Sequence, residues 1–144
     1  MRKDKETEHL VKKSFLSIPK SWVLRLSDIN TGERPGDILA LVGPHKILVE
    51  VKYTSKDTLI FSAVKPFQLT SSIQFSALHK YNHGIFIVDY GNHGLYAFDG
   101  RFVAKQFYDR KSIKPEKHDF SIHIAYSKES FLDLITECVK WKSY

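Results

Sequence analysis

Two carboxylates and an amine interrupt the most apolar part of the sequence. Asp37 opens the run 37–42, and Glu50 and Lys52 interrupt the run 47–52. A carboxylate or an ammonium group buried in a sheet costs several kcal/mol unless it is paired or bound to a metal. We therefore expect each of these charges to have a partner, either one of the other two or a bound cation.

Whether the three charges share a site depends on how the two strands pair. Glu50 and Lys52 are two residues apart, so on a strand their side chains point to the same face. If Val42 pairs with Ile47, Asp37 lies on that face as well, opposite the lysine. A shift by one residue moves Asp37 to the other face. A shared site therefore requires the first register, or a bulge equivalent to it.

These residue types suit metal-dependent hydrolysis of a phosphodiester. Mg²⁺ takes oxygen ligands, usually one or two carboxylates together with waters and phosphate oxygens. The cation neutralises charge on the phosphate and acidifies a water, and a nearby lysine can orient or deprotonate that water. A buried ion pair of Lys52 with Glu50 or Asp37 accounts for the same residues. The residue types alone leave both interpretations open.

The surrounding patterns predict the elements that position these side chains. Helical spacing predicts helices over 5–15 and 66–81 and a final helix capped by Ser127. Strands are predicted over 22–26, 37–42, 46–53, 84–89, 95–98 and 120–126, and a loop over 30–36. The two strands that carry the charges are apolar on both faces, so helices should cover both sides of the sheet. A single mixed α/β domain over 1–144 is expected.

Basic residues outnumber acidic ones, 22 to 16, for a formal charge of +6. Such a balance is compatible with a phosphate-backbone partner. The densest stretch, 105–117, is predicted as a basic connection between two strands. Basic residues with interleaved aromatics can pair with phosphates and stack on bases. The same stretch could instead be a solvated surface loop. Arg25 could instead pair with a carboxylate. The candidate nucleic-acid contacts are Arg25, Arg34, Lys56, Lys105, Arg110, Lys111 and Lys114.

Other chemistries find little support in the sequence. The lone cysteine, Cys138, excludes an internal disulfide or a four-cysteine metal site, and it favours a reducing, cytoplasmic compartment. No apolar run approaches the roughly 20 residues of a membrane span. The histidines lack zinc-protease spacing, and the serines lack the setting of a nucleophile. The sequence contains no glycine-rich phosphate-binding loop that would indicate a small-molecule cofactor.

The residues around the charges resemble a known nuclease pattern. The segment 35–37, Pro-Gly-Asp, followed by Glu50-Val51-Lys52, has the form PD…(D/E)XK, with a glycine inserted. It resembles the PD-(D/E)XK nuclease superfamily, whose core order of helix, three strands, helix and strand also matches. The segments 12–28, 61–68 and 84–90 resemble RecU-like, phage-type Holliday-junction resolvases. The likeness covers roughly residues 6–100.

The resemblance implies a fold and a set of roles. The fold is a restriction-endonuclease-like core (αβββαβ) with a central mixed sheet flanked by helices. The metal ligands are Asp37, Glu50, Glu8 and the Val51 carbonyl, with Mg²⁺ as cofactor and Mn²⁺ as a substitute. Lys52 is the catalytic lysine, and Gln68 faces the site from the next helix. Glu6 could replace Glu8, because the sequence leaves the helix register open, and Phe67 stands where the family has histidine.

The function that the resemblance implies is a structure-selective DNA endonuclease. A homodimer would resolve a four-way DNA junction by paired symmetric nicks that leave 5′-phosphate and 3′-hydroxyl ends. A phage or mobile-element origin is implied in the same way. Two alternatives remain open: a restriction-like or nicking nuclease of the same fold, and a non-catalytic nucleic-acid-binding module in which Glu50 and Lys52 form a structural ion pair.

Overall fold

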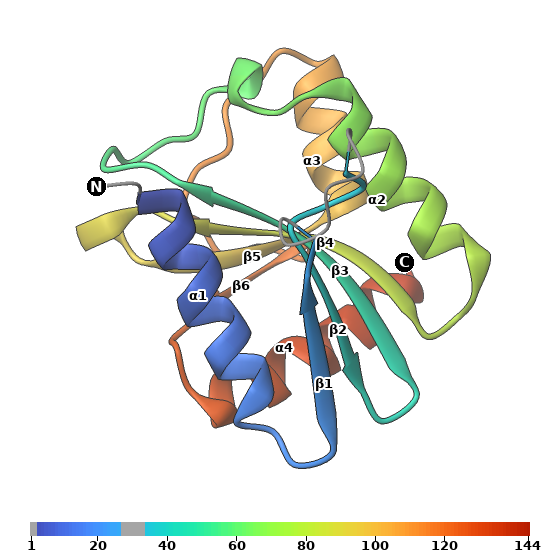
Figure 1. Cartoon of the computed structure of the whole chain (residues 1–144). Coiled ribbons are helices and arrows are strands. Elements are labelled where there is room, and N and C mark those ends of the chain that lie inside the picture. The colour runs from blue at the N-terminus through green and yellow to red at the C-terminus, as the bar shows by residue number, and fades with distance from the viewer. Residues whose placement is uncertain (1–2, 27–33) are drawn as a thin grey trace.

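Six strands form one mixed sheet in the computed structural model, which describes residues 3–26 and 34–144 (Figure 1). The strands are β1 (Ser21–Arg25), β2 (Ile38–Val42), β3 (His45–Tyr53), β4 (Asn82–Asp89), β5 (Leu95–Asp99) and β6 (Ser121–Ile124). The helices are α1 (Lys3–Leu16), α2 (Pro66–Leu78), α3 (Gly100–Tyr108) and α4 (Lys128–Lys142), with short 3-10 turns η2 (Phe61–Ala63) and η3 (Gly91–His93).

The strands follow one another across the sheet in chain order. Neighbouring strands are antiparallel except β3 and β4, which are parallel. A parallel pair needs a crossover connection, and α2 supplies it. The first six elements therefore follow the predicted order of helix, three strands, helix and strand.

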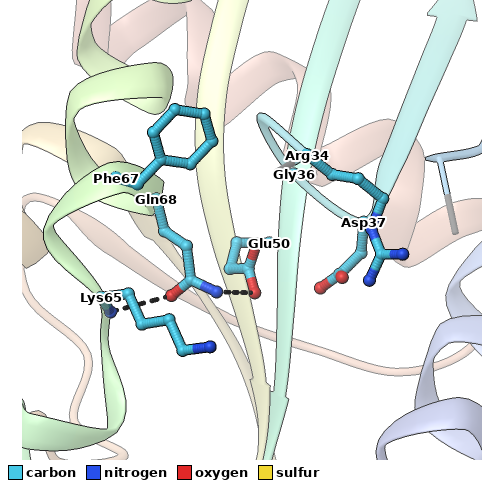
Figure 2. Close-up of a pocket in the computed structure, with 7 residues that line it drawn as sticks. All are labelled: Arg34, Gly36, Asp37, Glu50, Lys65, Phe67 and Gln68. Atoms are coloured by element: carbon cyan, nitrogen blue, oxygen red, sulfur yellow. Dashed lines mark hydrogen bonds between the residues drawn. The ribbon is translucent and has the colours of Figure 1, made fainter. Parts of the chain in front are cut away.

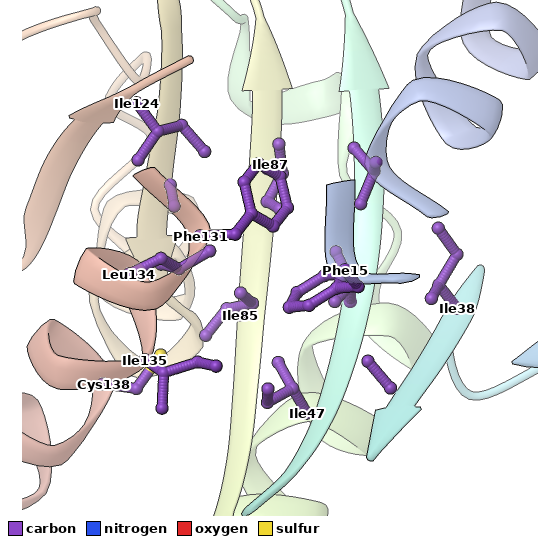
Figure 3. Close-up of a cluster of buried hydrophobic side chains, with 14 of the residues drawn as sticks. Phe15, Ile38, Ile47, Ile85, Ile87, Ile124, Phe131, Leu134, Ile135 and Cys138 are labelled. Carbon is purple, nitrogen blue, oxygen red and sulfur yellow. The ribbon is translucent and has the colours of Figure 1, made fainter. Parts of the chain in front are cut away.

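One face of the sheet is covered by α1 and α4. Phe15 of α1 and Phe131 of α4 meet edge to face, with ring centroids 4.8 Å apart, and both are fully buried. Figure 3 shows the two rings above isoleucines of the central strands, among them Ile47 and Ile85. Burying aromatic rings against branched aliphatic side chains is the largest apolar contribution available to this face.

The other face is covered by α2 and α3. Its core joins Phe86 and Val88 of β4 to Leu69 of α2 and Val103 of α3. Glu50 pairs with Phe86 across β3 and β4, so its side chain belongs to this second face. Two apolar cores on opposite sides of the sheet confirm the prediction that helices cover both faces.

The hairpin register differs from the predicted one by two residues. Val42 pairs with His45, because a two-residue turn starting at Gly43 joins the strands. Gly43 has a φ of 56°, a left-handed conformation that glycine adopts without strain. A shift of two residues preserves the side-chain alternation of the hairpin. Asp37 itself lies just before the last ladder pair, and its carboxylate lies beside Glu50 rather than opposite Lys52.

The connection between β5 and β6 is the main difference from the sequence prediction. A basic connection was expected there, but Gly100–Tyr108 forms α3. The Asp99 side chain accepts a hydrogen bond from the Arg101 backbone N–H (3.3 Å), which starts the helix. The buried residues of α3 are Gly100 at its first position, Val103 and Ala104. With 9 residues, the helix is shorter than the length at which a periodic pattern reliably indicates a helix.

The other predicted elements are present with shifted ends. The helix predicted to reach residue 81 ends at Leu78, and the strand predicted over 120–126 spans Ser121–Ile124. Ser127 caps α4 by accepting a hydrogen bond from the Ser130 N–H (3.2 Å). The predicted loop over 30–36 lies partly outside the described residues. None of the described helices is long and apolar enough to cross a membrane.

The contact between α1 and α4 predicts a large effect of truncating Phe15. Phe15→Ala should lower the free energy of unfolding by about 3–5 kcal/mol, because it opens a cavity between α1, α4 and the sheet. Leu16→Ala, at a neighbouring side chain that is 46% exposed, should change it by less than about 0.5 kcal/mol. Urea denaturation measures both, and equal effects would contradict the packing described here.

Candidate active site

Asp37 is held against β3 at the start of the hairpin. Asp37 directly precedes the last pair of the ladder, Ile38 with Val49, and lines the same pocket as Glu50. The Asp37 backbone N–H donates to the Val49 carbonyl (2.9 Å), and its Oδ2 accepts from the Val51 N–H (2.7 Å). The carboxylate thus replaces a backbone acceptor where the ladder ends, which fixes its position beside the second acid.

Gly36, the residue inserted in the nuclease-like pattern, has a steric explanation. A Cβ at this position would lie 3.0 Å from Leu48 Cδ1 and 3.2 Å from the Val49 carbonyl oxygen. A larger residue would push the chain away from β3. Glycine therefore allows the segment before Asp37 to lie close enough for its hydrogen bonds to form.

Glu50 is the most buried acid of the site, with 6% of its surface exposed. Its Oε2 accepts a hydrogen bond from Gln68 Nε2 (2.8 Å) and lies 3.5 Å from Lys52 Nζ. Gln68 is itself oriented, because its Oε1 accepts from the Lys65 backbone N–H (3.0 Å) at the start of α2. Figure 2 shows Glu50 between Gln68 on one side and Asp37 on the other. The structure thus brings together four of the predicted site residues.

A pocket of about 320 Å³ opens over these acids. Its lining comprises Arg34, Gly36, Asp37, Glu50, Lys65, Phe67 and Gln68. Arg34 and Lys65 are exposed and stand on opposite sides of Glu50 (Figure 2). Lys65 was missed by the sequence analysis, although its place directly before Pro66 and three residues before Gln68 is a usable signal. The pocket therefore combines an acidic floor with cationic sides.

Glu8 is buried near this site but has a different partner. Its Oε1 lies 3.3 Å from Arg25 Nη2. Burial is the main cause that raises the pKa of Glu8, and the negative charge of Asp37 adds to it. Glu6 is nearer the helix surface and pairs with Lys3 (3.6 Å). Of the two acids considered for this position, Glu8 therefore points inward, and Arg25 takes the carboxylate partner that the sequence left open.

The predicted ligands of the metal are only partly assembled. Over residues 3–26 and 34–144, no three histidine, cysteine or acidic side chains converge as a metal-binding group. Asp37 and Glu50 are the two acids that face each other. Val51 contributes its N–H to Asp37, and the role of its carbonyl stays a prediction, as does a ligand role for Glu8.

The two facing carboxylates nevertheless fit a divalent cation. Burial and, second, the charge of Asp37 raise the pKa of Glu50, while Lys52 lowers it, and the net result is a pKa of about 8. The buried Glu50 and the half-buried Asp37 therefore repel each other when both are ionised, and a cation between them would relieve that repulsion. Carboxylate oxygens suit Mg²⁺ or Mn²⁺, and Mg²⁺ commonly takes only one or two protein carboxylates.

The remaining basic candidates lie away from this pocket. Lys56 is exposed in the turn after β3, where its N–H donates to Thr54 Oγ1 (3.2 Å). Lys105 lines a shallow apolar depression beside Phe120 and Tyr144. Arg110, Lys111 and Lys114 line a separate cavity beyond α3. The predicted basic stretch is thus divided between two places.

Glu50 should make the stability of the metal-free protein depend on pH. The pKa of Glu50 is about 8 in the folded protein, compared with an ordinary value of 4.5. The folded state therefore binds the Glu50 proton more tightly than the unfolded state does. The stabilisation of the folded state by this proton is fully present below pH 4.5 and is lost as the pH rises through 8. Wild type should lose up to about 4 kcal/mol over this range, and Glu50→Gln should not. Urea denaturation in a chelator measures this.

The matched control is Glu129→Gln, which neutralises an exposed glutamate in the first turn of α4. Its stability should follow the same pH curve as wild type. If the curves of wild type and Glu50→Gln run parallel, Glu50 does not hold its proton as described.

The comparisons with known proteins yield a match of fold and none of sequence. No protein-family model and no curated protein matches the chain. Among solved structures, the chain is similar to Hjc, a Holliday junction resolvase from the archaeal hyperthermophile Archaeoglobus fulgidus. The TM-score is 0.58 at 11% identity, covering 91% of this chain and 98% of Hjc. The chain therefore has the restriction-endonuclease-like α/β fold that Hjc has.

Proposed function

We propose that this protein is a metal-dependent DNA endonuclease that resolves four-way junctions. The observation that carries the proposal is the pair of facing acids, Asp37 and Glu50, beside the Lys52 ammonium group 3.5 Å from Glu50. This arrangement lies in a fold shared with a junction resolvase. The finer likeness to RecU-like, phage-type resolvases is part of the proposal and rests on the sequence pattern.

Each side chain has a role that its position supports. Asp37 and Glu50 would hold the cation, which when bound supplies charge neutralisation at the phosphate and acidifies water. Gln68 donates to Glu50 and so keeps one carboxylate oxygen turned toward α2. Lys52 would orient the attacking water and oppose negative charge that develops on the phosphate. In-line attack with departure of the 3′ oxygen leaves a 5′-phosphate end.

The cations at the sides of the pocket would position the DNA backbone. Arg34 and Lys65 are exposed on opposite sides of the acids, where they can pair with the phosphates that flank the cleaved bond. Contacts of this kind read backbone position rather than sequence, so selectivity would come from the shape of the junction. Two symmetric nicks require two active sites, for which a homodimer is the natural assembly.

One observation favours a second candidate function. The ion pair of Lys52 and Glu50 satisfies both charges without a metal, and the described residues supply two facing acids rather than three. A non-catalytic nucleic-acid-binding module would have these features. We favour the nuclease because a purely structural pair of Glu50 and Lys52 does not require Asp37 to lie beside Glu50, where it raises the pKa of that acid.

Cleavage of branched DNA tests the proposed function directly. With Mg²⁺ or Mn²⁺, a four-way junction should be nicked at least about tenfold faster than a linear duplex of the same arm sequence, and a chelator should abolish cleavage. Denaturing gels measure both rates and the end groups. Equal cutting of the two substrates would instead indicate a general duplex nuclease, and binding without any cutting would favour the module.

Substitution of Lys52 separates chemistry from binding. Lys52→Ala should lower the cleavage rate by about 100-fold or more, since it removes a cation from the transition state, while junction affinity in a chelator changes little. Lys46→Ala is the matched control, because Lys46 is an exposed lysine of the same strand and of the same face. Cleavage by Lys52→Ala at the rate of Lys46→Ala would contradict the proposed role.

A further inference from the structure

A second cationic depression lies beyond the end of α3. It has a volume of about 580 Å³, and an adjoining depression of about 510 Å³ shares Ser112, Lys114 and Glu116 with it. Together they form one groove, here called the basic groove and defined by its polar lining. Its defining residues are Gln106, Arg110, Lys111, Ser112, Lys114, Glu116 and His118 of the larger depression, with Asp57 and Thr58 of the smaller one.

The walls of the basic groove are fixed by hydrogen bonds to the body of the protein. Gln106 Nε2 donates to the Ser112 carbonyl (3.1 Å). The next residue, Ile113, is buried and exchanges two backbone hydrogen bonds with Leu59 (2.8 and 2.9 Å). On the far side, Ser121 Oγ donates to the Glu116 carbonyl (2.7 Å). A ligand would therefore meet a preformed surface, which lowers the entropy cost of binding.

The charges of the basic groove are unbalanced. Arg110, Lys111 and Lys114 line the groove against two acids, Glu116 and, in the smaller depression, Asp57. Within the described part of the chain, none of the three cations takes part in an ion pair. Three cations that share one fixed depression repel each other, and a polyanion would relieve that repulsion.

The backbone at Arg110 indicates that its side chain matters. Arg110 has a φ of 55°, in the left-handed region, directly after the helix end. Its N–H donates to the Phe107 carbonyl (3.1 Å), and the Lys111 N–H donates to the Gln106 carbonyl (2.8 Å). Glycine usually occupies this helix-ending position, and another residue there costs about 1 kcal/mol. A strained arginine that lines a cationic groove suggests a functional reason for the cost.

The basic groove lies on the sheet face that carries the active site. Helices α2 and α3 cover that face together. The loop that follows β3 carries Lys56 and then Asp57 and Thr58, which line the smaller depression. Figure 1 shows the segment after α3 beside this loop, and the bridge between Leu59 and Ile113 joins them. The active-site pocket and the groove are thus separate depressions on one face, so a branched polyanion with one strand at the pocket could place another segment in the groove.

We infer that the basic groove binds the phosphodiester backbone of a second DNA segment, an arm of the branched substrate other than the strand being cut. The inference rests on the proposed function for the identity of its ligand. The groove belongs to α3 and the segment after it, beyond the part of the chain that carries the nuclease-like pattern. It would add affinity for branched DNA without contributing to the chemistry.

The test compares two variants that each remove three positive charges. The groove variant is Arg110→Gly with Lys111→Gln and Lys114→Gln. The control variant is Lys20→Gly with Lys13→Gln and Lys128→Gln, because Lys20 also has a left-handed φ, of 60°. Both variants therefore relieve one strained residue and change the net charge equally. Binding of a labelled four-way junction and of one duplex arm is measured in a chelator over a series of salt concentrations.

The groove variant should bind the junction about 10- to 100-fold more weakly than wild type near physiological salt. The slope of log affinity against log salt should be smaller by about 2 to 3, as expected for the loss of up to three phosphate contacts. The control variant should stay within about threefold of wild type. Arg110→Gly alone should weaken binding while raising the unfolding free energy, by up to about 1 kcal/mol, so a folding defect cannot explain the loss.

Three outcomes would overturn the inference. The groove variant could bind the junction as the control does, or it could lose as much affinity for the single arm as for the junction. Alternatively, inorganic phosphate or a mononucleotide could bind wild type and not the groove variant while junction binding is unchanged. Cleavage by wild type in Mg²⁺ is a separate readout. A wild type that binds through the groove but never cuts would contradict the proposed function and leave this inference standing.

Discussion

Two acids held side by side in a partly buried site are the constraint on which the rest of this structure depends. Asp37, just before β2, lies beside Glu50 of β3, and burial together with the charge of Asp37 raises the pKa of Glu50 to about 8. A protein of ordinary stability tolerates such a cost when something else holds the groups in place. Here the Val51 N–H fixes one acid and the Gln68 amide fixes the other.

The surrounding fold explains why Asp37 and Glu50 are held in fixed positions. The site lies where the hairpin of β2 and β3 meets the start of α2, and both elements are anchored by apolar cores on the two faces of the sheet. Because the core residues are separate from the site residues, the charges can be arranged without weakening the packing. Gly36 shows how local this control is, since a single methyl group there would contact Leu48 and the β3 backbone.

Strain and unrelieved charge recur at both regions to which we assign DNA contact. At the active site the repulsion is between acids, whereas in the basic groove it is between cations, and Arg110 adds a left-handed backbone. Sites that bind charged ligands commonly retain such unfavourable features, because the ligand relieves them. The active-site acids are negatively charged, whereas the lining of the basic groove is positively charged. A phosphodiester substrate fits both, because it can share a cation with the acids and can place its own negative charges in the groove.

The order of elements and the identity of the central charges could be predicted from the sequence alone. Apolar alternation is a local property, so the strands around Glu50 and the faces they bury were predictable, as was Ser127 as a helix cap. The short helix α3 was not, because its 9 residues are fewer than a helical pattern needs to be recognised and the residues that follow are basic. The hairpin register could not be predicted, because the sequence left open one register that brings Asp37 to the face of Glu50 and one that does not, and the observed pairing of Val42 with His45 is neither of them.

Only the tertiary structure decided which charges meet. Glu8 pairs with Arg25, Lys65 joins the pocket, and Lys105 is separated from Arg110, although nothing in their local sequence distinguishes these outcomes. Contacts between residues distant in sequence depend on how helices dock on the sheet, and that docking is set by the summed packing of both cores. Residue types thus determined what chemistry is available, and packing determined where it is assembled.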